Sequence, residues 1–493
     1  MTPPRLLLAL AAMLMLAGCK VGPDYVKPDT PITDTYKEPP PDAFKDAGTW
    51  NQAVPADAAL RSNWWEMFGD KQLNALEQQV DTANQTLKQA EARFRQARAQ
   101  LGYNMAARMP TLSTGPGIAS LRDSLNRPYA TSTHTTGDLI LPFDLNYEVD
   151  LWGRIGRTIT ASGEEAQATN ADLQTASLSL HAELAIDYFG LRAADAQQKL
   201  LDDTVTAYGE ALRVTQNRVN GGAAPESDAA QAQTQLQTTQ VEATDIAAQR
   251  AQFEHAIAVL IGKPPAAFSL APAPLAIAPP VIPAGLPSEL LERRPDIAAA
   301  ERRVAEANEE IGIAKAAYYP SLIFDAQSGF EGHSFATWFN WPSLFWAVGL
   351  SMGETLFDGG RRRAASDQAR AAYDETVANY RQTTLTAFQE VEDNLSTLRV
   401  LDREAEQQDE ATVSARRSEE LANNRYIGGR DTYLQVVTTQ TAALQNERNA
   451  ADIQRRRLDA SVLLIKALGG GWKTGDLPTI DSLKKADDSD GPH

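Results

Sequence analysis

The single cysteine is the residue whose neighbours specify a chemical reaction most clearly. Leu16-Ala17-Gly18-Cys19 matches the bacterial lipobox and follows Arg5 and an apolar stretch, which is the pattern of a signal peptide. We therefore predict a signal peptide over residues 1–18 and lipidation of Cys19 as the first mature residue. Each buried CH₂ of an acyl chain contributes roughly 0.8 kcal/mol, so several chains would anchor the protein firmly.

The residue after the cysteine bears on the destination of the chain. It is Lys20, whereas an Asp there would commonly signal retention at the inner membrane. We predict a lipid-anchored protein of the outer membrane of a Gram-negative bacterium, with a long periplasmic part. The alternative is an ordinary secretory signal that contains a cysteine by chance.

The remaining sequence shows no pattern typical of a catalytic or metal site. Of five histidines, none forms a pair with the spacing of metal ligands. A single cysteine excludes an internal disulfide and a Cys-based zinc site. Gly-x-Gly strings lack the strand–loop–helix context of a nucleotide site. We predict that the protein is not an enzyme and has no catalytic residue, metal or cofactor.

Charge argues against a nucleic-acid-binding protein, and hydropathy argues against a transmembrane helix beyond the first twenty residues. Lys and Arg number 46 and Asp and Glu 64, which gives a formal charge of 46 − 64 = −18. A chain this acidic is a poor nucleic-acid binder, so no nucleic-acid partner is predicted. Beyond the first twenty residues no apolar run reaches the length of a transmembrane helix.

The chain between the termini is a duplicated unit. Gly153-Arg154 recurs 207 positions later as Gly360-Arg361, and Gly221-Gly222 recurs as Gly428-Gly429. Upstream the offset is 210, as in Pro110 and Pro320. Such self-similarity indicates repeats. The predicted divisions are a Pro-rich extended segment over 19–63, repeats over 64–262 and 287–470, a linker over 263–286 and a tail over 471–493. A floppy tether is the alternative for 19–63.

Each repeat has the pattern helix, β-hairpin, very long helix, tight turn and long helix. Residues 66–108 lack internal proline and predict one helix. Residues 157–219 and 361–426 predict helices of about 95 Å at 1.5 Å per residue. Such lengths suit pairs packed as coiled coils rather than a globular core. Several shorter helices are the alternative.

Between the helices, the hydrophobic period changes from 3.6 to 2. In 139–151, Leu, Phe, Tyr and Val alternate with Asp144, Asn146, Glu148 and Asp150. This pattern predicts a strand with one apolar and one carboxylate-bearing face. The predicted hairpins are 111–151 and 321–357, which give four strands in the chain.

Four strands cannot close a barrel, and open strand edges are unfavourable in lipid. The alternation resembles that of outer-membrane barrels, which are apolar outside and polar inside. Three chains would supply twelve strands. The predicted fold is therefore mainly α with a membrane β-barrel, in which a homotrimer forms a 12-stranded barrel on an α-helical periplasmic barrel. Asp144, Glu148 and Asp150 would face the lumen, and the aromatics in 338–346 would lie at the lipid interface. A soluble core patch is the alternative for these aromatics.

Several motifs in order make the chain resemble the TolC-like outer membrane factors, specifically the lipid-anchored NodT-type branch of tripartite efflux pumps. The motifs are Val21-Gly22-Pro23-Asp24-Tyr25 after the cysteine, Trp64-Trp65-Glu66-Met67-Phe68-Gly69-Asp70, Leu356-Phe357-Asp358-Gly359-Gly360-Arg361, Arg425-Tyr426-Ile427-Gly428-Gly429 and Leu468-Gly469-Gly470-Gly471-Trp472. The match covers nearly the whole mature chain.

The resemblance implies roles for the two turns between long helices. Their Gly pairs allow the positive φ that a reversal needs, and from the residues alone they need only connect. In the family such tips dock a periplasmic adaptor that also contacts an inner-membrane pump, here of the RND type. The implied docking residues are Gly221, Gly222, Gly428, Gly429 and Arg430.

The resemblance also implies a gate at the second turn. Leu434 matches a constricting apolar residue, and Arg425 matches a position that ties neighbouring helices together. Thr438 stands where the family often has Asp, which favours a ring of Leu434 over a ring of charge. The implied function is a passive exit duct for drugs or other small molecules. Alternatives are a duct for type I protein secretion and a lipoprotein coiled-coil spacer without a pore.

Overall fold

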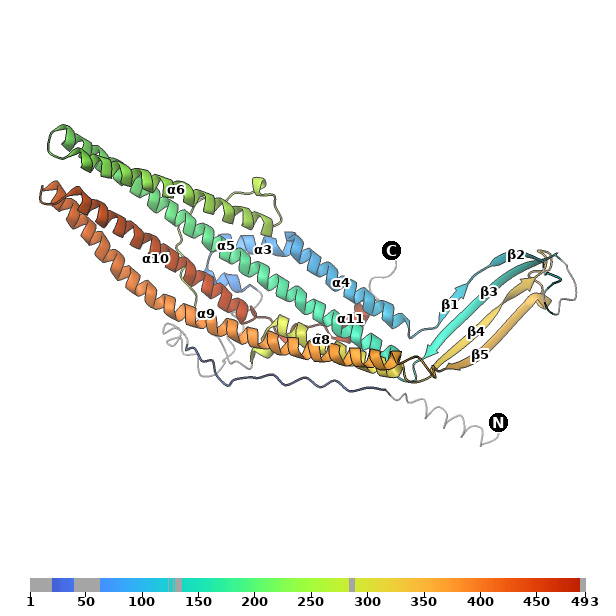
Figure 1. Cartoon of the computed structure of the whole chain (residues 1–493). Coiled ribbons are helices and arrows are strands. Elements are labelled where there is room, and N and C mark those ends of the chain that lie inside the picture. Colours follow the sequence, from blue (N-terminus) through green and yellow to red (C-terminus); the bar gives the residue numbers. More distant parts are fainter. Residues whose placement is uncertain are drawn as a thin grey trace.

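The structure is a computed structural model that describes residues 20–39, 63–122, 124–126, 128, 135–282 and 289–487. The predicted signal peptide and Cys19 lie outside the described residues. The chain is elongated, with two long helical hairpins ending in turns at one end and a β-sheet at the other (Figure 1). No helix in the described ranges is both long and apolar enough to cross a membrane.

The elements follow the same order twice. The first repeat contains η2 (Trp64–Phe68), α3 (Lys71–Ala83), α4 (Gln85–Ala106), β1 (Thr111–Thr114), β2 (Gly117–Arg122), β3 (Thr135–Val149), α5 (Arg154–Asn220) and α6 (Glu226–Leu260). The second contains α7 (Leu290–Arg293), α8 (Pro295–Ala316), β4 (Ser321–Gly332), β5 (Leu344–Gly353), α9 (Arg361–Ile427) and α10 (Tyr433–Ala467). The short helices η3 (Pro265–Ala267), η5 (Trp341–Ser343), η6 (Thr474–Asp476) and α11 (Ile480–Asp487) complete the described part.

Equivalent helices of the two repeats have equal lengths. Both α4 and α8 have 22 residues, and adding 210 to the bounds of α4 gives those of α8. Both α5 and α9 have 67 residues, and α6 and α10 have 35, with an offset of 207 in each case. A helix of 67 residues is about 100 Å long. The very long helices predicted from the sequence are therefore confirmed.

The prediction of one helix over 66–108 is wrong. The segment forms η2, α3 and α4, because two side chains end and restart the helix. Asp70 accepts from the backbone N–H groups of Gln72 and Leu73 and caps α3. Asn84, with extended backbone, caps α4 and donates from Nδ2 to the Leu260 carbonyl at 2.8 Å.

The first predicted strand is also interrupted. Both β1 and β2 pair antiparallel with β3 in one continuous register, since Thr114 faces Phe143 and Gly117 faces Ile140. Between them lies Gly115-Pro116, and proline has no N–H to donate to a ladder. The sheet is therefore five-stranded by count but has four strand positions.

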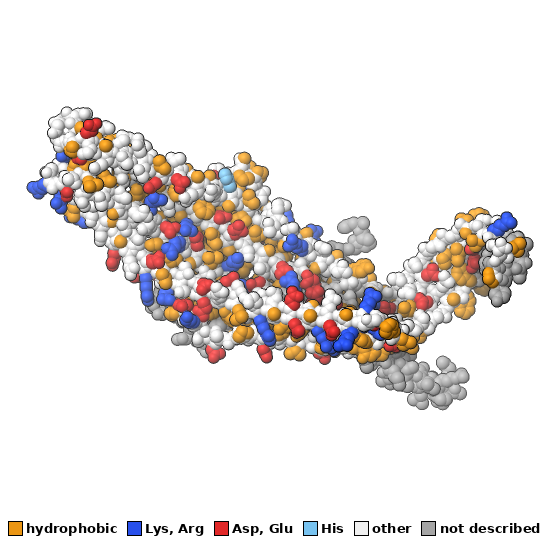
Figure 2. Space-filling view, viewed as in Figure 1, with side chains coloured by type: hydrophobic (Ala, Val, Ile, Leu, Met, Phe, Trp, Pro, Cys, Tyr) orange, Lys and Arg blue, Asp and Glu red, His pale blue; other side chains and the backbone are white. Residues whose placement is uncertain are grey.

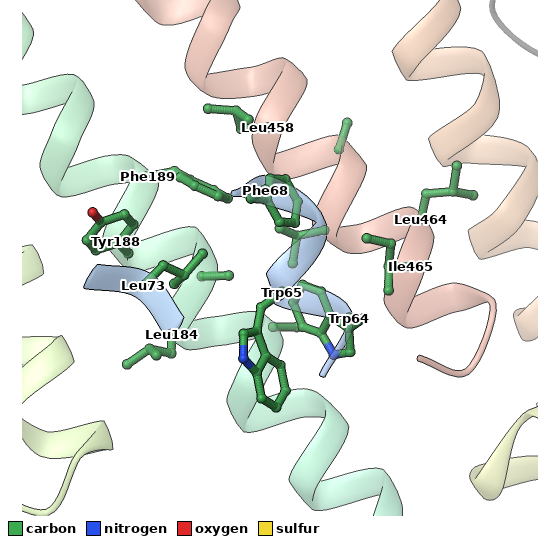
Figure 3. Packing of buried hydrophobic residues seen from close by; sticks show 14 of the residues in the cluster. Trp64, Trp65, Phe68, Leu73, Leu184, Tyr188, Phe189, Leu458, Leu464 and Ile465 are labelled. Carbon is green, nitrogen blue, oxygen red and sulfur yellow. The ribbon is translucent and has the colours of Figure 1, made fainter. Parts of the chain in front are cut away.

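A hydrophobic core joins the repeats at mid-length, where η2 and α3 pack between α5 and α10 (Figure 3). Trp64, Trp65 and Phe68 are buried, and Phe68 lies 5.0 Å from Phe189 between ring centroids. Burial of an aromatic side chain is worth roughly 1.5–3 kcal/mol. This cluster fixes the two long hairpins relative to each other.

The two ends of the described chain, residues 20–39 and α11, lie on opposite repeats. The N-terminal segment, residues 20–39, is extended and lies along α8 and α9 (Figure 1). The backbone N–H of Glu38 donates to Glu392 at 2.8 Å, and its carboxylate pairs with Arg399 at 2.6 Å. At the other end α11 packs on α4 and α5, with Leu483 buried beside Ile155.

Candidate functional sites: the sheet and the helix tips

Pairing of β3 with β4 joins the two hairpins into one sheet. Tyr147 faces Phe324, which faces Leu350 on β5, so residues of one kind line up across the strands. Most side chains on this face are apolar, and the polar ones are Thr114, Ser120, Arg122, Thr135 and Ser328. The apolar residues of the face are Leu112, Ile118, Leu139, Leu141, Phe143, Leu145, Tyr147, Val149, Leu322, Phe324, Ala326, Phe330, Leu344, Trp346, Val348, Leu350 and Met352.

The opposite face is polar in its central rows. Asp144 lies between Ser113 and Gln327, and Asn146 donates from Nδ2 to Asp325 at 2.7 Å. In these central rows the register therefore places polar residues on one face and apolar residues on the other.

The three predicted lumen carboxylates lie in different environments. Asp144 is on the polar face, and Glu148 is on the same face but pairs with Arg154 at 2.6 Å. The placement of Asp150 on the strand is wrong, because β3 ends at Val149. The Asp150 carboxylate instead accepts from the N–H groups of Ile155 and Gly156 at 3.0 and 2.7 Å. It compensates the positive end of the helix dipole of α5.

No long helix of the described residues packs across the apolar face of the sheet. Trp346 is 74% exposed, Leu350 64% and Met352 74%. Figure 2 shows few charged side chains over the sheet, whereas charged ones are scattered over the whole surface of the helices. In the part of the chain that the structure describes, both outer edges, β1–β2 on one side and β5 on the other, lack a neighbouring strand. An uncovered apolar face with two open edges is the sign of an incomplete membrane or oligomer surface.

Aromatic side chains lie at both ends of this sheet. At the far end Trp338 stacks on Phe339 at 4.8 Å, and Phe339 contacts Phe330 of the apolar face. At the helical end Trp152 stacks on Tyr319 at 4.7 Å. Aromatic bands at both borders of an apolar strip are typical of membrane barrels.

The described chain begins at the helical end of the sheet. The Val21 N–H donates to the Trp152 carbonyl at 3.2 Å. Arg157 is fully buried there, where it donates to Glu309 at 2.8 Å and to the Pro23 carbonyl at 3.2 Å. The first described residues are thus fixed beside the inner aromatic band.

At the opposite end of the molecule, both turns use the same backbone geometry. The Ala223 N–H donates to the Arg218 carbonyl at 2.7 Å, and the Arg430 N–H to that of Arg425 at 2.9 Å. This is the Schellman pattern, which needs a residue with positive φ. Only the second glycine of each pair has it, with φ of 71° at Gly222 and 68° at Gly429.

A cluster that the sequence did not predict ties the two turns together. The Arg218 guanidinium lies 4.7 Å from the centre of the Tyr426 ring and donates to the Ile427 carbonyl at 3.3 Å. Tyr426 packs edge-on against Tyr433 and donates to Asp228 at 3.3 Å. Burial raises the pKa of Tyr433 to about 12, so its hydroxyl stays protonated. The one sequence feature that could have drawn attention to Arg218 is its equivalence to Arg425 in the other repeat.

The predicted gate residues are only partly brought together. Leu434 is 59% exposed in the first turn of α10, and Thr438 lies one turn later, its hydroxyl donating to the Leu434 carbonyl at 2.9 Å. Arg425 contacts neither: it is exposed and pairs with Asp431 of its own turn at 3.4 Å. Arg430 is also exposed at this tip.

Residues 72–263 and 286–470 match the family model described as outer membrane efflux protein. The chain belongs to this family, and it is an outer-membrane channel protein of efflux systems. The family is one of export ducts.

Relatives of this kind match along most of the chain. The pyoverdine export outer membrane protein OpmQ of Pseudomonas aeruginosa is 33% identical over 426 residues, which are 85% of this chain and 89% of OpmQ. The toluene efflux pump outer membrane protein TtgF of Pseudomonas putida is 30% identical over 94% of this chain and 96% of its own. The solved outer-membrane channel OprN superposes with a TM-score of 0.84 at 29% identity and covers 92% of this chain and 100% of its own.

Proposed function

We propose that the protein works as a homotrimer whose three sheets close into one 12-stranded barrel in the outer membrane. The observation that carries this proposal is the uncovered apolar face of the sheet between two unpaired edges. Three copies would pair every edge and turn every apolar face to lipid. The polar face, with Asp144 and Glu148, would then line a water-filled lumen.

The long helical hairpins would continue this lumen into the periplasm. They project from the helical end of the sheet, and α5 and α9 alone are about 100 Å long. Twelve helical segments around one axis would form a conduit, with the two turns of each chain at its far end.

The cargo would be small organic molecules. OpmQ and TtgF are named for pyoverdine and toluene, which differ widely in polarity. A passive conduit suits such a range because it needs no cofactor and recognises no single substrate. Energy would come from an inner-membrane pump of the RND type, joined to the turns through a periplasmic adaptor. Gly221, Gly222, Gly428, Gly429 and Arg430 would form the docking surface.

We also propose that Leu434 closes the resting conduit. Its exposed side chain would meet two copies of itself at the threefold axis, and a narrow apolar ring blocks ions by dewetting. Thr438, one turn away, would add no charge to this ring. Arg425 would contact the neighbouring chain instead of its own.

A lipid on Cys19 would suit the same arrangement. Val21 is held beside Trp152, at the inner aromatic band, so a cysteine two residues earlier would lie near the membrane surface. Lipidation would then add an anchor at the border where the barrel ends.

The gate is tested by conductance of the purified full-length protein in planar bilayers. Leu434→Ser should raise conductance well above that of the unmodified channel. Ile427→Ser is the matched control, because Ile427 is also 59% exposed at the same tip but is the last residue of α9 and not part of α10. Equal conductance of the Leu434 variant and the unmodified channel would contradict the gate.

Export itself is tested in the source bacterium. A strain without the gene should tolerate toluene less well, and the cloned gene should restore the loss. A full-length protein that is monomeric in detergent and never conducts would overturn the proposed duct.

A further inference from the structure

A cavity of about 620 Å³ lies where the two repeats of one chain meet. Its walls come from η2, α3 and α5 of the first repeat, and from the start of α8 and the segment after α10 in the second. Trp65 of η2 lies beside α5 in this wall (Figure 3), and Trp472 contributes a second indole. The volume is within the range of about 300–1,000 Å³ that is typical of small-molecule sites.

Several polar groups that line this cavity have no partner in the described part of the chain. Trp65 is only 3% exposed, yet no described residue accepts a hydrogen bond from its indole N–H. The amide of Gln174 and the hydroxyl of Ser177, both on α5, also lack a described partner. Because a buried indole N–H usually has an acceptor, these groups indicate a place for water or for a polar ligand.

A buried cluster of titratable residues supports the same wall. His181 stacks on Trp65 with 4.4 Å between ring centroids, and it binds Glu77 through Nδ1 at 2.7 Å and Asp81 through Nε2 at 3.0 Å. The Glu77 side chain is fully buried, and its Oε1 has no partner among the described residues. The Asp81 side chain is 53% exposed and lines the cavity, so it can accept a hydrogen bond from a ligand.

The fold does not require polar residues at these positions. In the second repeat the equivalents of His181 and Asp81 are Phe388 and Leu291, and both pack against hydrophobic clusters. Burial of polar groups costs stability unless each group is hydrogen-bonded, so apolar residues would suit the same backbone better. The polar set of the first repeat therefore has a reason other than packing.

The cavity opens on the outside of the proposed conduit. His181 follows Arg154 by 27 residues of α5, which is about seven and a half turns, so the two side chains leave opposite sides of the helix. Arg154 pairs with Glu148 on the polar face of the sheet, the face that would line the lumen. Gln167, on the same side of α5 as His181, donates to the Pro478 carbonyl at 2.8 Å. The cavity thus faces the surroundings of the duct and not its cargo.

We propose that this cavity binds a neutral saccharide. The apolar C–H face of a sugar ring packs on indole rings, and its hydroxyls both donate to a carboxylate such as Asp81 and accept from the N–H groups of Trp65 and Gln174. Asp81 and Asp476 stand against Lys473 at the cavity, so the wall carries little net charge to attract an ion. The inference goes beyond the proposed export and uses only its periplasmic location, about 40 Å from the sheet along α5.

Binding is measured by isothermal titration calorimetry on the purified full-length protein in a detergent without a sugar headgroup. The probes are triacetylchitotriose and maltotriose, which differ in their acetamido groups. Gln174→Leu should weaken binding about tenfold by removing one hydrogen-bonding group, and Ser177→Phe should abolish binding by filling the cavity. Gln216→Leu is the matched control, because Gln216 is an exposed residue of the same helix outside the cavity.

Sedimentation with purified cell-wall sacculi distinguishes a glycan strand from a free sugar. Co-sedimentation that is lost in Ser177→Phe assigns the ligand to the cell wall, whereas calorimetric binding without co-sedimentation assigns it to a free saccharide. Absence of binding to both probes and to sacculi overturns the inference. Equal binding by the unmodified protein and both cavity variants, with normal helix content by circular dichroism, also overturns it. Conductance in bilayers should be unchanged in every variant, so the proposed duct is judged separately.

Discussion

Arg218 and Arg425 occupy the same position in the two repeats, just before a Gly-Gly turn, yet they bind different partners. Arg218 reaches across to the end of α9 and lies over Tyr426. Arg425 pairs with Asp431 in its own turn and is largely exposed. The first repeat thus binds the second, whereas the second presents the same kind of group at the outer flank of the chain.

The same difference runs along the helices. Arg157 is fully buried against α8, and its equivalent Ala364 lies on an exposed flank of α9. The two repeats therefore share one backbone fold but differ in which helix surfaces are buried. One face holds the chain together, and its equivalent in the second repeat is exposed.

The largest expected effect comes from replacing Arg157. Arg157→Met should lower the free energy of unfolding by about 3–5 kcal/mol, because buried Glu309 loses its close partner. Ala364→Met, at the equivalent exposed position, should change it by less than about 0.5 kcal/mol. Thermal unfolding followed by circular dichroism measures both. Similar losses at the two positions would contradict the difference between the repeats.

The sheet provides the next test, because there both repeats should behave alike. Leu145→Lys and its equivalent Met352→Lys should each cost about 2–4 kcal/mol of assembly in the membrane, since both lie on the apolar face. Asp144→Lys, on the polar face, should be milder. The yield of oligomer that resists detergent in outer-membrane fractions measures all three. If Asp144→Lys were the most harmful, the assignment of the two faces would be reversed.

Local periodicity explains what could be predicted from the sequence. The long helices and the one-sided strand at 139–149 depend on residues close together in the chain, and the duplication shows as residue types that recur 207 or 210 positions apart. The break at Asn84 could not be predicted, because it depends on a hydrogen bond to Leu260. The alternation continues past Val149 and therefore predicts Asp150 on the strand. In the structure its carboxylate instead accepts a hydrogen bond from the first turn of α5.

The same distinction between local and long-range contacts applies to the candidate functional residues. Arg157 pairs with Glu309 on another helix, 152 residues away, so its burial could not be predicted from the neighbouring sequence. Leu434 and Thr438 were placed together correctly on one helix, since four residues is one turn. Their closure of a lumen, the docking role of the glycines and the lipid on Cys19 stay predictions.

The turns offer a smaller effect with a built-in control. Gly429→Ala should cost about 1–2 kcal/mol locally, because φ is 68° and only the backbone is strained. Gly428→Ala should be nearly neutral, since that residue has φ of −74°. Hydrogen exchange at the tips measures the difference. Gly222→Ala should match Gly429→Ala, and unequal costs would show that the two turns are not equivalent.

The smallest effect concerns a titrating pair that only the first repeat has. His181 binds buried Glu77 through Nδ1 at 2.7 Å and Asp81 through Nε2 at 3.0 Å, whereas its equivalent in the second repeat is Phe388. Burial opposes charging of the imidazole, but the hydrogen bond and charge of Glu77 outweigh it and raise the pKa of His181. Burial also raises the pKa of Glu77 to about 7.

Both pKa values lie above their ordinary ones, so the folded chain binds these protons more tightly than the unfolded chain does. Stability from this pair is therefore present at low pH and is lost as pH rises from about 5 to 8, by at most ~1.4 kcal/mol per pH unit for each proton. Unfolding midpoints across this range should fall less steeply in Glu77→Gln/His181→Phe than in the unmodified chain. Equal slopes in the double variant and the unmodified chain would show that the pH dependence arises outside the first repeat's own pair.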